Sequence, residues 1–204
     1  MEQAVFTFLF ADLAGFTALT EMHGDDDATD VVTRFYGLAR ASLANEARLI
    51  KTIGDAVMII ADETPSAVST ALRLAAAVRA EPGFPAVRIG LHCGPAVERS
   101  GDYFGATVNL AARITAYARS DQILCTEAVT ESIRGLEVVV VHSVGIAGFK
   151  NVAQPVALFE IEDLECHKLH HEIDPVCRMV IDPNTAPARA TGRYLLQTRV
   201  WGVI

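Results

Sequence analysis

Two aspartates, Asp12 and Asp55, lie beside glycine-containing turns at the ends of apolar segments. Asp12 is near the end of the apolar run 4–13, and Asp55 follows Gly54 within "LIKTIGDAVMII" (49–60). Because side chains at strand ends can reach a cleft, this pair could bind Mg²⁺ or Mn²⁺, which prefer oxygen ligands and substrate phosphates. Each residue could instead have a local role, Asp12 as a helix cap and Asp55 as a turn residue.

A second group of polar residues lies in "GDYFGATVNLAAR" (101–113). Asn109 and Arg113 are four residues apart on a predicted helix and therefore share one face. An arginine fork can hold phosphate oxygens and an asparagine can bond a sugar hydroxyl, although a solvated helix face has the same spacing. Asp102 is expected in the loop before this helix, either accepting a hydrogen bond, for example from an exocyclic amine, or completing an Asx-type turn.

The surrounding pattern predicts the elements that would position these residues. Strands are expected at 4–13, 86–97, 122–126, 137–144 and 156–162, with a hairpin at 49–60. Helices are expected at 25–47, 64–80 (with Thr64 as N-cap), 105–118 and 127–133. Alternating strands and helices in this order predict helices packed on a mixed sheet.

Composition narrows the classes of function. The 204 residues include 51% hydrophobic and 21% charged residues, as in an ordinary globular protein, and the formal net charge is −8. Without a cluster of Lys and Arg, binding to nucleic acid or to an anionic membrane surface is not expected. No apolar run approaches the roughly 18 residues of a membrane span. Four scattered cysteines without a CxxC pair favour reduced thiols and a cytoplasmic location.

Four motifs occur in a fixed order: "FADLAGFT", "KTIGDA", "GLHCGPA" and "GDYFGATVNLAAR". Together they closely resemble the catalytic domain of class III nucleotidyl cyclases, over roughly residues 4–162. The resemblance implies a ferredoxin-like α+β domain at residues 1–165, with helices mainly on one face of the sheet. It also implies a head-to-tail homodimer with shared active sites, since this one chain carries both the metal-binding and the nucleotide-reading residues.

The same resemblance implies how the phosphate end of the nucleotide is bound. Asp12 and Asp55, with the backbone carbonyl of Leu13, would hold two divalent ions, Mg²⁺ or Mn²⁺. A helix that starts after the first strand would present its amide groups to the phosphates. The residues that would provide these amides are Gly15, Phe16 and Thr17.

The remaining site residues would position the reacting atoms and read the base. Arg113 would stabilise charge on the α-phosphate, Asn109 would orient the ribose, and Lys150 would contact the terminal phosphates. Lys51 can donate to N1 of adenine and Asp102 can accept from its 6-amino group, whereas guanine presents the reverse pattern. The resemblance therefore implies an adenylate cyclase that converts ATP to 3′,5′-cyclic AMP and pyrophosphate. The alternatives are a guanylyl or mixed-specificity cyclase and a catalytically silent nucleotide-binding domain.

The composition shifts after residue 165, so a separate tail is expected at 166–204. The segment "DPVCRMVIDPNTAPA" (174–188) resembles the start of a YHS domain, but Arg178 replaces the usual glycine and the second half of that module is missing. A truncated, dispensable remnant is therefore expected, although a metal-sensing module is an alternative. Possible zinc ligands in this tail are Cys166, His167, His170, His171 and Cys177.

Overall fold

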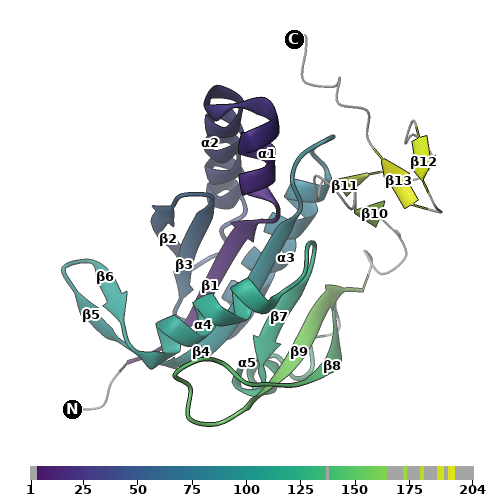
Figure 1. Cartoon of the computed structure of the whole chain (residues 1–204). Helices are drawn as coiled ribbons and strands as arrows, with labels where there is room; N and C mark the ends of the chain where they lie inside the picture. The colour runs from purple at the N-terminus through teal and green to yellow at the C-terminus, as the bar shows by residue number, and fades with distance from the viewer. Residues whose placement is uncertain are drawn as a thin grey trace.

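The computed structural model of the protein describes residues 4–136 and 138–164, together with short strand segments at 172–173, 180–181, 188–190 and 193–195. Seven strands form one sheet in the order β2-β3-β1-β4-β7-β9-β8 (Figure 1). Only β4 and β7 pair in parallel among these neighbours. The strands are β1 (Val5–Leu13), β2 (Ala47–Ile53), β3 (Ala56–Ala61), β4 (Val87–Pro95), β7 (Ile123–Thr126), β8 (Val139–Ala147) and β9 (Val156–Asp163).

Helices and small hairpins complete the described structure. The helices are α1 (Phe16–His23), α2 (Asp25–Ala41), α3 (Thr64–Arg79), α4 (Ala106–Tyr117) and α5 (Glu127–Ser132). The hairpins pair β5 (Val97–Arg99) with β6 (Asp102–Phe104), β10 (Glu172–Ile173) with β11 (Val180–Ile181), and β12 (Ala188–Ala190) with β13 (Arg193–Leu195). From β1 to β4 the elements follow the βαββαβ order of a ferredoxin-like fold, as predicted, with α1 and α2 together in the place of the first helix.

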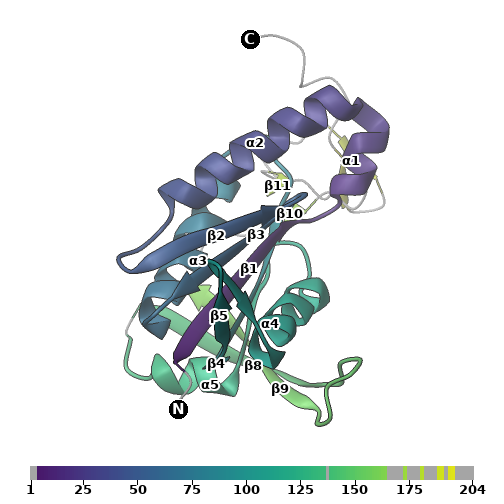
Figure 2. The ribbon, with the colours of Figure 1, turned by 90° about the vertical axis from the view of Figure 1, so that its left-hand side faces the viewer.

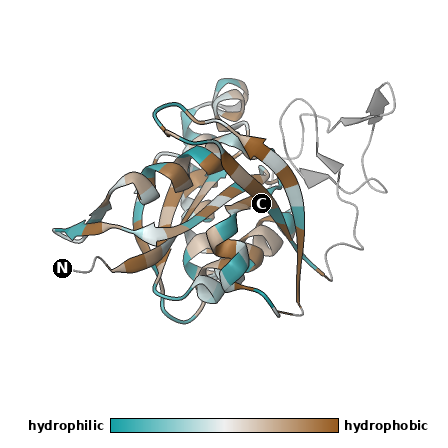
Figure 3. Ribbon diagram, turned by 90° about the horizontal axis from the view of Figure 1, so that it is seen from below, coloured by the Kyte–Doolittle hydropathy of each residue, from teal (hydrophilic) through white to brown (hydrophobic). Residues whose placement is uncertain are grey.

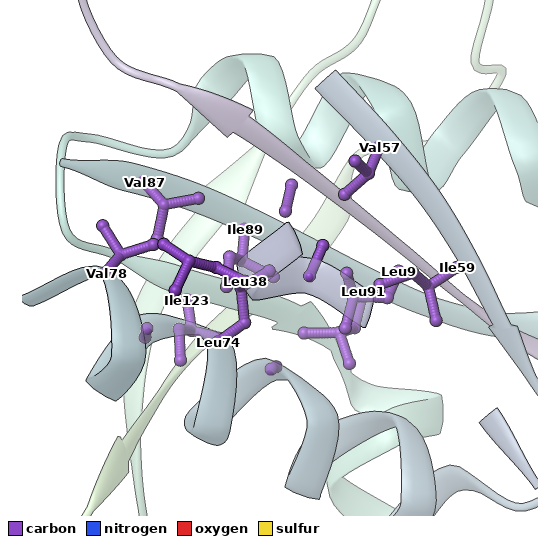
Figure 4. Close-up of a cluster of buried hydrophobic side chains, with 14 of the residues drawn as sticks. Leu9, Leu38, Val57, Ile59, Leu74, Val78, Val87, Ile89, Leu91 and Ile123 are labelled. Atoms are coloured by element: carbon purple, nitrogen blue, oxygen red, sulfur yellow. The ribbon is translucent and has the colours of Figure 1, made fainter. Parts of the chain in front are cut away.

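The two faces of the sheet carry separate cores because successive residues of a strand point to opposite sides. On one face Leu9, Ala11 and Leu13 of β1 pack with residues of α2 and α3. Figure 4 shows Leu9 in this cluster with Leu38 of α2 and Leu74 of α3.

On the other face Phe8 and Phe10 pack with residues of α4 and of the β5–β6 hairpin. Figure 2 shows α4 and this hairpin in front of the sheet. The hydropathy colouring shows the hydrophobic residues gathered along the strands of the sheet (Figure 3). Helices thus lie mainly on one face, and α4 covers the other.

Helix α4 approaches the sheet closely at Gly90 of β4. A Cβ atom at Gly90 would lie 2.5 Å from Oγ1 of Thr115 and 2.9 Å from the carbonyl oxygen of Ala111. A contact this short with the helix backbone leaves room only for glycine. Gly90 therefore sets the depth of α4, which carries Arg113, relative to the neighbouring strand β1, which carries Asp12.

The structure differs from the sequence prediction at three points. Helix α2 ends at Ala41, well before the predicted end. Helix α1, by contrast, starts after the first strand as the resemblance implied, although the local pattern of the segment is that of a turn. The N-cap of α3 is Glu63, and the Thr64 hydroxyl instead lies 2.8 Å from Oγ1 of Thr7 in a buried pair. Asp102 lies in strand β6, whereas a loop was expected.

Within the residues that the structure describes, no helix has both the length and the apolar character needed to cross a membrane. The predicted zinc ligands and the YHS-like segment fall outside the described residues, apart from the isolated strand segments. The expected boundary at residue 165 and the expected properties of the tail therefore stay predictions.

Candidate active site

The carboxylates of Asp12 and Asp55 lie next to each other at the end of β1. Asp12 is paired in register with Ala56 of β3, which directly follows Asp55, and the Leu13 amide donates a 3.2 Å hydrogen bond to the Asp55 carbonyl. Burial and repulsion from the Asp12 carboxylate raise the pKa of Asp55 above its usual value. The strand register and the backbone hydrogen bond thus place the two residues side by side at the end of β1.

The Asp12–Asp55 pair fits a hard divalent cation. Two neighbouring carboxylates supply oxygen donors, and a bound cation would remove the repulsion that raises the pKa of Asp55. Over residues 4–136 and 138–164, no cluster of three or more His, Cys, Asp or Glu side chains could hold a metal. Further donors would therefore be backbone carbonyls, such as that of Leu13, water, or phosphate oxygens. Magnesium sites commonly have this composition, with one or two carboxylates plus substrate phosphates.

Arg88, which was not predicted as a site residue, contacts the Asp12 carboxylate of this pair. It lies opposite Asp12 on the neighbouring strand β4, and its Nε donates a 2.7 Å hydrogen bond to Oδ2 of Asp12. Nη2 contacts the same oxygen, while Nη1 donates to the carbonyl of Ala116 in the last turn of α4, at 3.5 Å. The sequence does place Arg88 on the polar face of the expected strand 86–97. It does not show that this strand pairs with the strand that carries Asp12, and that pairing brings the two residues together.

Helix α1 starts at Phe16, four residues after Asp12 and three residues after the end of β1. Its N-cap, Gly15, has the left-handed conformation (φ 79°) that favours glycine. The first amides of a helix lack intrahelical acceptors, and the helix dipole favours an anion there. The amides of Gly15, Phe16 and Thr17 are thus placed beside the carboxylate pair, where an anionic group could bind.

The two predicted base-reading residues contact each other directly. Nζ of Lys51 lies 2.7 Å from both carboxylate oxygens of Asp102, which the β5–β6 hairpin brings across the sheet to β2. The Lys51 ammonium, and secondarily the Tyr103 amide at 2.8 Å, hold the pKa of Asp102 below its usual value. This pair combines a hydrogen-bond donor and an acceptor at one place on the surface.

The predicted transition-state residues lie on α4. Asn109 is exposed, and Arg113 follows one turn later on the same helix. Nη1 of Arg113 donates to the backbone carbonyl of Lys150, while the Lys150 side chain is exposed. The structure therefore brings Arg113 and the segment around Lys150 together.

The register of the sheet places these groups on one face. Asp12 shares a row with Ile53 and Ala56, and Lys51 lies in the next row, paired with Met58. Neighbouring rows on one face are two residues apart along the strands, or about 7 Å. The tight turn between β2 and β3 is held by the Tyr36 hydroxyl, which donates to the Gly54 carbonyl. In this single chain the contacts form three groups: Asp12 with Asp55 and Arg88, Lys51 with Asp102, and Arg113 with Lys150.

Comparison with known proteins gives one family. The model of the adenylate and guanylate cyclase catalytic domain matches residues 2–159. A pH-sensitive adenylate cyclase of Mycobacterium tuberculosis is 40% identical over 127 residues, which make up 62% of this chain and 32% of that protein. An adenylate cyclase of Streptomyces griseus is 41% identical over 116 residues, or 56% of this chain and 29% of that protein. The matched region is thus about a third of the length of these curated relatives.

Solved structures share the fold. Adenylate cyclases from Trypanosoma brucei in their monomeric state give a TM-score of 0.69 at 24% identity, covering 78% of this chain and 89% of that one. An adenylyl cyclase from P. aeruginosa gives 0.66 at 22% identity, covering 79% and 95%. A guanylate cyclase domain from Catenaria anguillulae in complex with GTP gives 0.65 at 19% identity, covering 80% and 99%. Proteins named for either nucleotide share this fold, so the fold alone does not select the base.

Proposed function

Because the chain belongs to the family of class III adenylate and guanylate cyclase catalytic domains, we propose that it converts ATP to 3′,5′-cyclic AMP and pyrophosphate. In this reaction the ribose 3′-oxygen forms a bond to the α-phosphorus, and the bond from that phosphorus to the β-phosphate bridging oxygen breaks. The observation that carries the proposal is the direct contact of Lys51 and Asp102, on the same sheet face as the Asp12–Asp55 pair.

Asp12 and Asp55 would hold two divalent ions, Mg²⁺ or Mn²⁺, with the Leu13 carbonyl as a further ligand. Such ions activate the 3′-hydroxyl and neutralise charge on the triphosphate. The protein contributes the position of the ligands: both carboxylates are fixed at the end of β1 by the pairing of Asp12 with Ala56 and by the backbone bond from Leu13 to Asp55.

The remaining phosphate contacts would come from uncharged amides and from cationic side chains. The amides of Gly15, Phe16 and Thr17 at the start of α1 would bind phosphate oxygens close to the carboxylate pair. Arg113 would exchange the Lys150 carbonyl for oxygens of the α-phosphate, where negative charge develops. The Lys150 side chain, which is exposed, would reach the terminal phosphates. Asn109 would hold the ribose.

Adenine would be read by Lys51 and Asp102. The Lys51 ammonium would donate to N1, and the Asp102 carboxylate would accept from the 6-amino group. Guanine has a proton on N1 and an acceptor at O6. The Lys51 donor would then face another donor, and the Asp102 acceptor would face another acceptor. The two residues already hold each other at 2.7 Å without nucleotide, so little reordering is required when the base binds.

Each active site would lie between two copies of the chain arranged head to tail. One copy would supply Asp12 and Asp55, and the other Lys51, Asp102, Asn109 and Arg113. Apolar side chains around this face support an interface, because Ile53, Val97 and Phe104 are 50%, 50% and 52% exposed. A cytoplasmic location remains part of the proposal.

Incubation of the purified protein with ATP or GTP and with Mg²⁺ or Mn²⁺ tests the proposed activity. We expect cyclic AMP and pyrophosphate in equal amounts, and at least tenfold less cyclic GMP, as measured by chromatography of the products. Absence of any cyclic nucleotide under all four conditions would contradict the catalytic proposal. Cyclic GMP as the main product would contradict only the assignment of the base.

A chain that ends at Glu165 should keep cyclase activity within about twofold of the full chain. All eleven proposed site residues lie within the described residues 4–136 and 138–164, before this position. Activity and the midpoint of thermal unfolding would be compared for both lengths at equal protein concentration. Loss of activity with an unchanged unfolding midpoint would show that the tail contributes to the site, contrary to the predicted dispensable remnant.

A further inference from the structure

Arg88 forms an ion pair with Asp12, which is a proposed metal ligand. The side chains of Arg88 and Asp12 are 33% and 16% exposed, so the pair is only partly screened by water. Two guanidinium nitrogens contact the same carboxylate oxygen of Asp12, Oδ2. The third nitrogen reaches the Ala116 carbonyl at 3.5 Å, so the guanidinium is held between β1 and the end of α4.

The charge of Arg88 acts on both carboxylates. Its guanidinium contacts Asp12, and Asp55 lies beside Asp12, because Asp12 is paired with Ala56 and the Leu13 amide bonds to the Asp55 carbonyl. Two ionised carboxylates and one guanidinium give this cluster a net charge of about −1, where the carboxylates alone would give −2. A divalent cation is therefore attracted less strongly than two aspartates alone would attract it.

We propose that Arg88 is a positioning residue that orients Asp12 through Oδ2 and weakens the binding of divalent cations to the nucleotide-free protein. The proposal rests on the proposed function, because it requires the Asp12–Asp55 pair to be the metal site. Its consequence is that cations bind tightly only together with the triphosphate, whose charge outweighs that of Arg88. A metal-loaded site without substrate would then be rare.

The test is a titration of nucleotide-free protein with Mn²⁺, in which the electron paramagnetic resonance signal of free Mn²⁺ gives the dissociation constant. Removing one positive charge beside a divalent cation should change its binding by roughly tenfold even in a water-like dielectric. We therefore expect Arg88→Gln to bind Mn²⁺ about tenfold more tightly than the wild type. Arg88→Lys keeps the charge and should bind within about twofold of the wild type.

Arg79 provides a matched control. Its Nε contacts both oxygens of Asp121 at 2.8 and 2.9 Å, and the two side chains are 20% and 19% exposed. Asp121 precedes β7 and its amide donates to the Val87 carbonyl, so the carboxylate that holds Arg79 lies across β4 from Asp12. Arg79→Gln should therefore leave the Mn²⁺ dissociation constant unchanged, whatever it does to the unfolding midpoint. Tighter Mn²⁺ binding by Arg79→Gln would show that a general change in net charge is sufficient, which would overturn the role given to Arg88.

The outcomes separate the role of Arg88 from the metal site itself. If Arg88→Gln is folded by circular dichroism but binds Mn²⁺ as weakly as the wild type, or more weakly, the role of Arg88 is overturned while the metal site stands. If Arg88→Gln does not fold, the Arg88→Lys variant decides. Mn²⁺ binding as in the wild type would support the role of the charge. Tenfold tighter Mn²⁺ binding, with the charge retained, would contradict it. If neither the wild type nor Arg88→Gln binds Mn²⁺, even with an uncyclisable ATP analogue, the proposed metal site itself fails.

Discussion

An equimolar mixture of Asp12→Ala and Arg113→Ala chains should recover about a quarter of wild-type cyclase activity, although each variant alone should lose roughly 10²–10³-fold. Asp12 would bind metal in one site, while Arg113 of the same chain would act in the other. A heterodimer therefore has one site that lacks both residues and one site that is intact. Random pairing makes half of the dimers heterodimers, and each of these has half of the wild-type sites.

The control for this mixture is a pair of variants from the same side of the site. Asp12→Ala mixed with Asp55→Ala should stay inactive, because every site in the heterodimer then lacks one of the two carboxylates. Formation of heterodimers would be measured with two different affinity tags and native mass spectrometry. If heterodimers of Asp12→Ala and Arg113→Ala form but show no activity, the shared site is contradicted.

Replacing both base-reading residues, Lys51→Glu with Asp102→Asn, should shift the ratio of kcat/KM for GTP to that for ATP by about 10²–10⁴-fold toward GTP. Glutamate at position 51 would accept from N1 and the 2-amino group of guanine, and the asparagine amide would donate to O6. Lys51→Glu alone should lose activity with both nucleotides. In the wild type the two residues are 2.7 Å apart, so the single change would set one carboxylate against another.

The Asp62→Asn variant is the control for this change in base preference. Asp62 follows β3 and forms two 2.9 Å hydrogen bonds with Arg48 of β2, so the substitution weakens another ion pair of the same hairpin. It should leave the ratio of GTP to ATP use unchanged. The assignment of Lys51 and Asp102 would be contradicted if the double variant still preferred ATP as strongly as the wild type, provided that it folds.

Periodicity and motif order were sufficient to predict most of the fold. Apolar residues at helical and at alternating spacing predicted α2, α3, α4 and the main strands, and the βαββαβ order followed from the arrangement of these elements. Helix α1 was not predicted from the local pattern, because "AGFT" contains a glycine and no long amphipathic repeat. The end of α2 was placed too late because Ala44 and Ala47 continue a helical pattern that β2 interrupts.

The contacts within the site were harder to predict, since they depend on pairing between distant strands. Arg88 faces Asp12 only in the observed register of β1 and β4, and the alternation of each strand alone does not specify that register. Asp102 was expected in a loop because β5 and β6 have three residues each, too few to show alternation. Its direct contact with Lys51 follows from that hairpin.

The β2–β3 hairpin, closed by a tight turn that Tyr36 holds, has a genetic consequence. Lys51 and Asp55 are close neighbours in the sequence, yet in a head-to-tail dimer they belong to different catalytic units. Inactivating alleles at these two positions should therefore complement each other when expressed together. Alleles at Asp12 and Asp55, which are far apart in the gene, should fall into one complementation group. Whether two alleles complement each other would depend on which catalytic unit of the dimer contains each residue, and not on the distance between their codons.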